Sequence, residues 1–249
     1  MSPGWQRFEA ELAQWSHPAP LWWRDDDAVA DTQALRQLIE LQQGGSKVPL
    51  HLASIPGSLE SSLPDLIGKS PNTWILQHGY NHHNHALPGQ KKIELGGELS
   101  TDELMARLGR GRHILVAAFA ERYVDIIVPP WNRYDEAATT AIGHLGYKAL
   151  SGLGLRTKKP APFPQLNVHI DIIDWREGRF IGTEACLTEI TQKLASRRLG
   201  HSDSTEPLGL MTHHLAHDGG CWDFLREFMF KTAEHPKIKW LEAKETLKA

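Results

Sequence analysis

Short apolar runs alternate with segments whose apolar residues recur at helical spacing along the whole chain. The apolar runs predict buried strands, and the periodic segments predict helices. The predicted strands span residues 19–23, 48–55, 74–76, 124–128, 148–151, 168–175, 208–212 and 238–241. The predicted helices span residues 34–41, 59–67, 100–119, 135–145, 188–199 and 221–234. Strand followed by helix from end to end predicts an α/β fold with a mainly parallel sheet.

Capping and turn residues mark the ends of some predicted elements. Ser100 followed by Asp102 and Glu103 predicts a capped helix start, and Gly146 closes the helix that follows residue 134. Residues 156–165 are basic and proline-rich, which predicts a loop. The chain has 249 residues, no repeat and no long linker. We therefore predict one domain over residues 1–249.

Composition narrows the class of protein. Hydrophobic residues make up 41% and charged residues 23%, as in globular domains, and the net charge of −3 gives no basic face for nucleic acid. No stretch approaches the ~20 apolar residues of a membrane span, and the first residues lack the apolar core of a signal peptide. A cytoplasmic protein without nucleic-acid or membrane partners is expected, with Cys186 and Cys221 as free thiols.

Polar clusters follow the predicted strands at several places. They occupy residues 25–27, 78–85, 130–133, 171–174 and 213–218. Many of the histidines of the chain lie in the clusters 78–85 and 213–218. In an α/β barrel the carboxyl ends of the strands open onto one face, where catalytic groups gather. The five clusters therefore predict one shared site.

The residue types in these clusters favour metal chemistry. His78 and His82 are four apart, which on a helical turn puts both imidazoles on one face. Together with a carboxylate of the Asp25–Asp27 run they make a three-ligand set that leaves a position for water. Taken singly, the aspartates also fit a solvated turn and the histidines a surface loop. A carboxylate beside a histidine orients the ring and raises its pKa, and Asp174 with His213 is the predicted pair.

In their order, the five clusters resemble the motifs of the polysaccharide deacetylase family, named for its NodB homology domain (carbohydrate esterase family four). Arg24–Ala28 matches Thr-Phe-Asp-Asp-Gly, and His78–His82 matches His-Ser/Thr-x-x-His. The other three matches are Val128–Asn132 for Arg-x-Pro-Tyr/Trp, Asp171–Trp175 for Asp-x-x-Asp-Trp, and Met211–His213 for Leu-x-His.

The resemblance implies a distorted (β/α) barrel and a hydrolase that removes an N- or O-linked acetyl group from a carbohydrate. Asp27, His78 and His82 would bind a divalent metal, zinc first, with cobalt, nickel or manganese as alternatives. Asp26 would be the general base that acts on the metal-activated water, and His213, held by Asp174, the general acid. The implied substrate-binding residues are Trp131, Pro130, Asn132, Trp175 and Met211.

Departures from the family pattern leave alternatives open. Val128 stands where the family has an arginine that pairs with the base, and Arg24 or Arg133 would have to replace it. Gly79 replaces the usual hydroxyl residue, and Ala28 the usual glycine. A shifted register would make Asp25 the base and Asp26 the ligand, and His214 competes with His213 as the acid. The rival functions are a non-catalytic metal- or carbohydrate-binding barrel and a hydrolase of a non-sugar amide.

Overall fold

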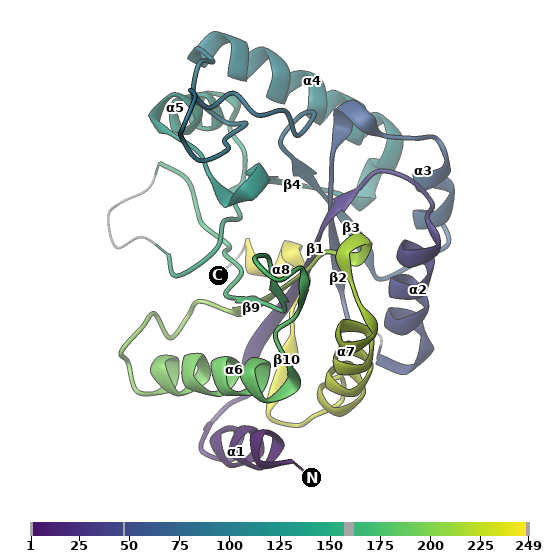
Figure 1. Ribbon diagram of the computed structural model, residues 1–249, viewed down its shortest axis with the longest axis vertical. Helices are drawn as coiled ribbons and strands as arrows, with labels where there is room; N and C mark the ends of the chain where they lie inside the picture. The colour runs from purple at the N-terminus through teal and green to yellow at the C-terminus, as the bar shows by residue number, and fades with distance from the viewer. Residues whose placement is uncertain (1, 47, 157–161, 248–249) are drawn as a thin grey trace. The chain divides into compact units, whose positions relative to one another are not determined.

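The computed structural model describes residues 2–46, 48–156 and 162–247 (Figure 1). Contacts gather into two compact units. The first unit comprises Met1–Asp25, Thr32–Leu50 and Val168–Ala249, and the second comprises Asp26–Asp31 and His51–Asn167. Strands β1 (Ala19–Ala28) and β2 (Leu50–Ser54) contribute residues to both units. The single domain over residues 1–249 stays a prediction.

The first unit is built on parallel strands. Strand β9 (Leu208–Thr212) pairs with β1 on one side and β6 (Ile170–Asp171) on the other, and β10 (Ile238–Trp240) also pairs with β1. The register sets Asp25 opposite Thr212. The unit also contains an antiparallel hairpin, β7 (Ile173–Asp174) with β8 (Arg179–Phe180). Its helices after the first are α2 (Gln33–Leu41), α6 (Thr183–Arg198), α7 (Gly219–Thr232) and α8 (Ala243–Thr246).

Helix α1 (Pro3–Leu12) is an element that the sequence analysis did not predict. Pro3 at its first position suits a helix start, because no hydrogen bond needs the missing N–H there. Trp5, Phe8 and Leu12 recur at helical spacing and are buried. The helix packs along α6 (Figure 1), and the ring of Phe8 lies 5.9 Å from that of Phe228 on α7. Aromatic packing therefore fixes the start of the chain.

The second unit carries the strands that lead to the histidine cluster. Strand β4 (Tyr123–Val128) pairs in parallel with β3 (Thr73–His78) and with β5 (Ala149–Leu150), and β2 follows β3 in the sheet. Its helices are α3 (Ser62–Ile67), α4 (Thr101–Phe119) and α5 (Glu136–Leu145). The predicted cap of α4 is confirmed, because Ser100 and Glu103 form a reciprocal capping box. Apolar residues of α4 and α5 pack on Ile127 and Leu150 to form the unit's core.

The predicted α/β class is confirmed, but three segments differ from the prediction. The strand predicted to end at Trp23 continues through the aspartate run as β1, where Arg24, Asp25 and Asp26 are all buried. The strand predicted over 168–175 is divided between β6 and the hairpin strand β7, and the helix predicted from 188 begins at Thr183. Of the loop predicted over 156–165, residues 157–161 lie outside the described residues.

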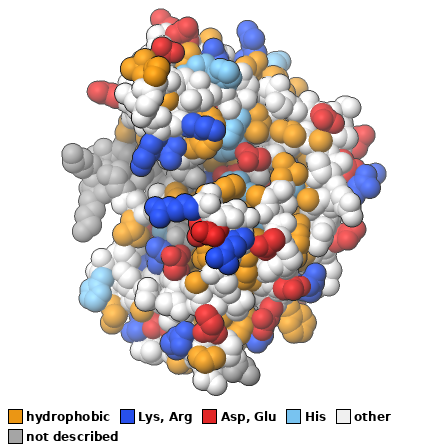
Figure 2. All heavy atoms as spheres, in the orientation of Figure 1, with side chains coloured by type: hydrophobic (Ala, Val, Ile, Leu, Met, Phe, Trp, Pro, Cys, Tyr) orange, Lys and Arg blue, Asp and Glu red, His pale blue; other side chains and the backbone are white. Residues whose placement is uncertain are grey.

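Across the described ranges, no helix combines the length and the apolar character that a bilayer crossing requires. Side chains of both charge signs are present on the face shown in Figure 2. This mixture agrees with the small net charge of −3.

Two phenylalanines test the packing of α1. Phe8 is 0% exposed and Phe230 is 82% exposed. We expect Phe8→Ala to lower the free energy of unfolding by about 3–5 kcal/mol, because it removes a buried ring and leaves a cavity. Phe230→Ala, the matched control, should change it by no more than about 0.5 kcal/mol. Urea titration followed by tryptophan fluorescence measures both, and equal effects would contradict the packing described.

Candidate metal centre

His78 is the last residue of β3, and the strand register fixes its ring. The register pairs His78 with Val128 on β4, and the His78 Nδ1 atom lies 3.1 Å from the Val128 carbonyl oxygen. Since a carbonyl can only accept, Nδ1 carries the proton and donates. In the neutral imidazole, the Nε2 atom of His78 then has a lone pair for another partner.

His82 lies in a loop, so the predicted helical turn is wrong. Gly79 and His82 both have positive φ angles, 53° and 56°. These angles bend the chain so that the two rings still face each other, with centroids 5.2 Å apart. The spacing of four residues brings the imidazoles together through this bend and not through helical periodicity.

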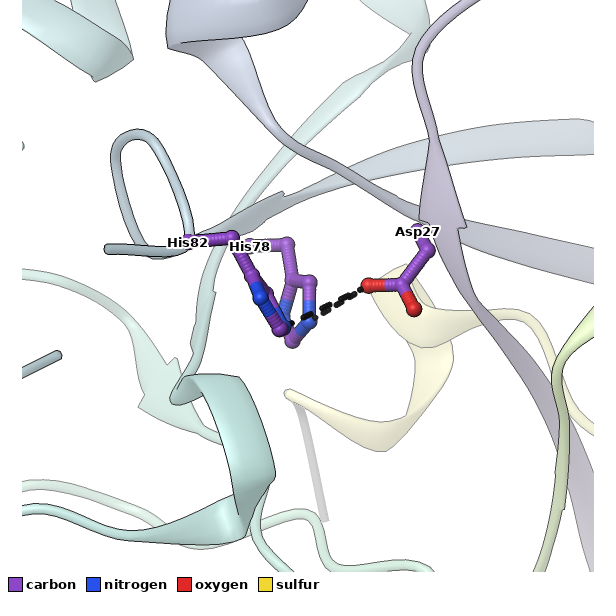
Figure 3. Close-up of side chains that lie close together, drawn as sticks. All are labelled: Asp27, His78 and His82. Atoms are coloured by element: carbon purple, nitrogen blue, oxygen red, sulfur yellow. Dashed lines mark ion pairs between the residues drawn. The ribbon is translucent and has the colours of Figure 1, made fainter. Parts of the chain in front are cut away.

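Asp27 completes the cluster (Figure 3). Its Oδ1 atom lies 3.2 Å from His78 Nε2 and 3.6 Å from His82 Nε2. Asp27 itself has a φ of 73°, a left-handed conformation that aspartate tolerates better than most residues. All three side chains belong to the second unit, and their ligand atoms lie within 4.8 Å of one another.

The spacing of the three atoms fits a metal ion. Ligands about 2.0–2.1 Å from a tetrahedral zinc lie roughly 3.4 Å apart, and the observed separations of 3.2 and 3.6 Å are close to this value. Burial, reinforced by His78, lowers the pKa of His82, although Asp27 acts in the opposite direction. The neutral imidazole is the form that binds metal. The donor set is therefore the one that the sequence predicted for a divalent metal.

Trp131 lies against this cluster. Its ring centroid is 4.4 Å from that of His82, and the ammonium of Lys92 lies 5.7 Å from the Trp131 ring centroid. Trp131 and Asn132 have φ angles of 54° and 53° in the turn after Pro130. Such angles are unfavourable for a bulky residue and are kept where the surroundings impose them. The predicted wall residue thus touches a predicted ligand directly.

The other aspartates of the run differ in setting. Asp25, in the first unit, is 0% exposed. Its Oδ1 atom lies 2.5 Å from His214 Nδ1, and its Oδ2 atom accepts hydrogen bonds from the Thr212 hydroxyl at 2.6 Å and the His214 N–H at 3.0 Å. Burial alone would raise the pKa of Asp25, but the facing His214 and the hydrogen bonds lower it overall. Asp25 and His214 thus pair with each other, and their roles as base and acid in the shifted register stay alternatives.

Asp26 and Asp27 fit the unshifted register better. Asp26 is 2% exposed and lies next to Asp27 on β1. Asp27 meets the two histidines. The assignment of Asp26 as general base stays a prediction.

His213 and the fourth motif belong to the first unit. The His213 ring stands edge-on to Trp175 with centroids 4.7 Å apart, and Trp175 is 56% exposed. Asp174 accepts hydrogen bonds from the N–H groups of Arg176 and Glu177 at 2.9 and 3.4 Å. These contacts cap a turn, so they do not support the predicted pairing of Asp174 with His213.

Each of the two predicted substitutes for the family arginine has a defined contact, and their pairing with the base stays a prediction. Arg24 is fully buried, and its Nη2 atom donates to the sulfur of Met211 at 3.1 Å. Arg133 donates from Nη1 to the carbonyl of Lys92 at 3.0 Å. Met211 is buried, as a pocket floor would be, but its contact with substrate stays a prediction.

Two buried residues that the sequence analysis missed support the His78–His82 loop. Glu94 accepts hydrogen bonds from three successive backbone N–H groups of the loop. Gln77 donates to the Gly79 carbonyl at 2.9 Å and accepts from the Tyr147 hydroxyl at 2.7 Å. The sequence offered only a slight indication of the role of Glu94, which is a charged residue between the apolar Ile93 and Leu95.

The chain has the fold of the polysaccharide deacetylases. Neither a protein-family model nor a curated protein matches the sequence. Solved structures match over nearly the whole chain at low identity, which confirms the predicted resemblance at the level of the fold.

Three of these structures illustrate the match. A protein of Mycobacterium smegmatis designated a polysaccharide deacetylase is 12% identical, with a TM-score of 0.65 over 94% of this chain and 91% of its own. The peptidoglycan N-acetylglucosamine deacetylase Bc1960 is 15% identical, with a TM-score of 0.58 over 93% and 89%. A family 4 acetyl xylan esterase from Clostridium thermocellum, in complex with a cobalt ion, is 10% identical, with a TM-score of 0.58 over 92% and 90%.

His217 gives a pH-dependent prediction. Burial lowers the pKa of His217 to about 4, and among the described residues neither ring nitrogen has a hydrogen-bond partner. As the pH falls from 7 to 5, the unfolded chain takes up this proton and the folded chain does not, so the free energy of unfolding decreases. The contribution of this one residue should be roughly 2 kcal/mol over that interval.

Urea unfolding of the wild type and of His217→Gln at the two pH values isolates this contribution, because the loss of packing is the same at both. The variant should be less sensitive to acid than the wild type. An identical pH dependence in the two proteins would contradict a neutral, partly buried His217.

Proposed function

We propose that this protein is a metal-dependent hydrolase that removes an acetyl group, N- or O-linked, from a carbohydrate. The observation that carries the proposal is the meeting of Asp27 Oδ1 with the Nε2 atoms of His78 and His82 in a polysaccharide deacetylase fold. Two of the similar structures are named for deacetylase activity and one for acetyl xylan esterase activity.

Asp27, His78 and His82 would hold the ion, and zinc suits one carboxylate with two imidazoles. A divalent metal at such a site polarises an acyl carbonyl and lowers the pKa of water toward neutrality. Cobalt, nickel and manganese are the alternatives, and a cobalt ion is bound in the acetyl xylan esterase from Clostridium thermocellum. The hydrogen bond from His78 Nδ1 to Val128 sets the tautomer that such binding needs.

The remaining roles in the proposal come from the sequence motifs. Asp26 would remove a proton from the attacking water, and His213 would protonate the departing amine or alcohol. Aromatic side chains suit sugar rings, and Trp131 and Trp175 are the proposed contacts. Pro130, Asn132 and Met211 are further proposed substrate contacts from the same motifs.

A binding protein that has kept the metal centre is the second candidate. It is favoured by Val128, which occupies the position of the family arginine and contributes only its backbone carbonyl to the centre. A hydrolase of a non-sugar amide would use the same ligands and the same proton transfers. Activity on a panel of acetylated sugars and small amides separates these candidates.

Adjacent histidines provide a matched test of the metal centre. His82 meets Asp27, whereas His83 is exposed. We expect His82→Ala to lower zinc affinity by more than roughly a hundredfold, since losing an outer-shell partner alone costs about 10–100-fold. His83→Ala should bind zinc as the wild type does. Competition with a chelator measures affinity, and acetate release from N-acetylglucosamine oligomers and acetylated small sugars measures activity.

The outcomes of this experiment discriminate between the candidates. Zinc binding with metal-dependent acetate release, both lost in His82→Ala, supports the deacetylase. Zinc binding without turnover on any sugar favours a binding role or a non-sugar amide. A wild type that binds no divalent metal would exclude the proposed centre.

The competing acid candidates, His213 and His214, should respond differently to substitution. We expect His213→Asn to lower kcat by about 10²–10⁴-fold and to leave zinc affinity unchanged, because a general acid acts only on the leaving group. His214→Asn should instead lower the free energy of unfolding by about 3–5 kcal/mol, because it leaves the buried Asp25 carboxylate without its histidine. Steady-state kinetics and urea titration distinguish the two, and a stable His214→Asn with lost kcat would reverse the assignment.

A further inference from the structure

The loop that carries His82 is wrapped around a buried carboxylate. Glu94 is 1% exposed. Its Oε1 atom accepts hydrogen bonds from the N–H groups of Tyr80 and Asn81 at 2.8 and 2.9 Å, and its Oε2 atom accepts from the N–H of His82 at 3.0 Å. Three successive N–H groups that converge on one anion form the backbone concavity that proteins use to bind anions.

Glu94 itself is firmly held. The Ile93 carbonyl accepts a hydrogen bond from the His85 N–H at 2.7 Å, and the Leu95 carbonyl accepts one from the Asp135 N–H at 3.2 Å. Leu95 is also a member of the core cluster of the second unit. The carboxylate therefore presents a fixed surface, and the loop adapts to it.

Gly79 shows how closely the loop and the carboxylate fit. A Cβ atom at this position would lie 2.2 Å from Glu94 Oε2 and 2.7 Å from Pro130 Cγ, and the φ of 53° disfavours a side chain in any case. The family motif has serine or threonine at this position, whereas the φ of Gly79 and the nearby Glu94 disfavour a side chain there. The carboxylate occupies the space that a side chain at position 79 would need.

The hydrogen bond to His82 also accounts for its backbone conformation. His82 has a φ of 56°, which is uncommon for a residue with a side chain. Such a conformation persists only where the surroundings impose it. Charge-assisted hydrogen bonds from the loop to Glu94 supply the necessary free energy.

We infer that Glu94 is a positioning residue for the metal centre, which holds His82 with its Nε2 atom toward Asp27 Oδ1. The expected effect of Glu94 on metal affinity rests on the proposed metal site. The expected effect of Glu94 on the loop requires no metal. Glu94 touches neither the ligand atoms nor substrate, so it acts through the backbone of His82.

Glu94→Gln tests the inference without changing side-chain size. Its amide oxygen can still accept hydrogen bonds from two N–H groups, but its NH₂ group cannot accept the third. We expect zinc affinity, measured by chelator competition, to fall by roughly 10–100-fold. Amide hydrogen exchange of Tyr80, Asn81 and His82 in the metal-free protein should become roughly ten- to a hundredfold faster.

Asp125→Asn is the matched control. Asp125 is a half-buried carboxylate of the same unit that pairs with Arg112 and does not contact the loop. Its substitution should disturb stability through that pair while zinc affinity and the exchange of the loop amides stay at wild-type values. Thermal unfolding of both variants confirms that each is folded.

A double-mutant cycle tests the fit between Glu94 and Gly79. Gly79→Ser should lower zinc affinity in the wild-type background, because the added side chain meets Glu94. In a Glu94→Ala background the same substitution should cost less, since the clash with Glu94 is removed while the clash with Pro130 and the unfavourable backbone conformation remain. Additive effects of the two substitutions on zinc affinity would contradict the close fit between Gly79 and Glu94.

The inference is overturned if Glu94→Gln keeps both wild-type zinc affinity and protected loop amides. It is also overturned if Asp125→Asn reproduces both losses, because the effect would then be a general loss of stability. A wild type that binds no zinc would remove the proposed function, whereas the exchange measurement would still decide whether Glu94 holds the loop.

Discussion

The proposed metal centre depends on holding three potential ligand atoms close to one another. The Asp27 carboxylate oxygen and the Nε2 atoms of His78 and His82 point at one place, where only a cation or protons relieve their mutual repulsion. Neutral imidazoles must therefore be fixed in the correct tautomer and direction. The pairing of β3 with β4 sets the tautomer of His78 through the Val128 carbonyl. The hydrogen bond from the His82 N–H to Glu94 holds the backbone of His82.

Unfavourable backbone conformations concentrate at this centre. Asp27, His82, Trp131 and Asn132 are four of the five residues other than glycine that have positive φ among the described residues. Each such conformation costs free energy, and proteins keep it mainly where function requires a particular direction of a side chain. Here one strained residue is a proposed ligand in β1, one is a ligand in the loop, and Trp131 packs on that ligand. These conformations set the directions of the side chains around the proposed site.

Much of the fold could be predicted because its determinants are local. The capping box at Ser100 and the left-handed Gly146 mark helix ends where the sequence placed them. Asp27 and His78 were predictable as neighbours because each lies at or near the carboxyl end of a strand, and their cluster with His82 is found within one unit. The conformation of the His78–His82 loop was not, because it depends on Glu94, which joins the loop only through tertiary contacts. The contacts of Asp174 in the hairpin turn were not evident from spacing either, and its pairing with His213 stays a prediction.

The central claim is that Asp27, His78 and His82 bind one divalent metal. Anomalous diffraction at the zinc absorption edge, from crystals of the zinc-loaded protein, tests it most directly. The account predicts one strong peak among these three side chains, next to Asp27 Oδ1 and both histidine Nε2 atoms. A peak confined to other residues, or no peak in crystals grown with zinc, would contradict it.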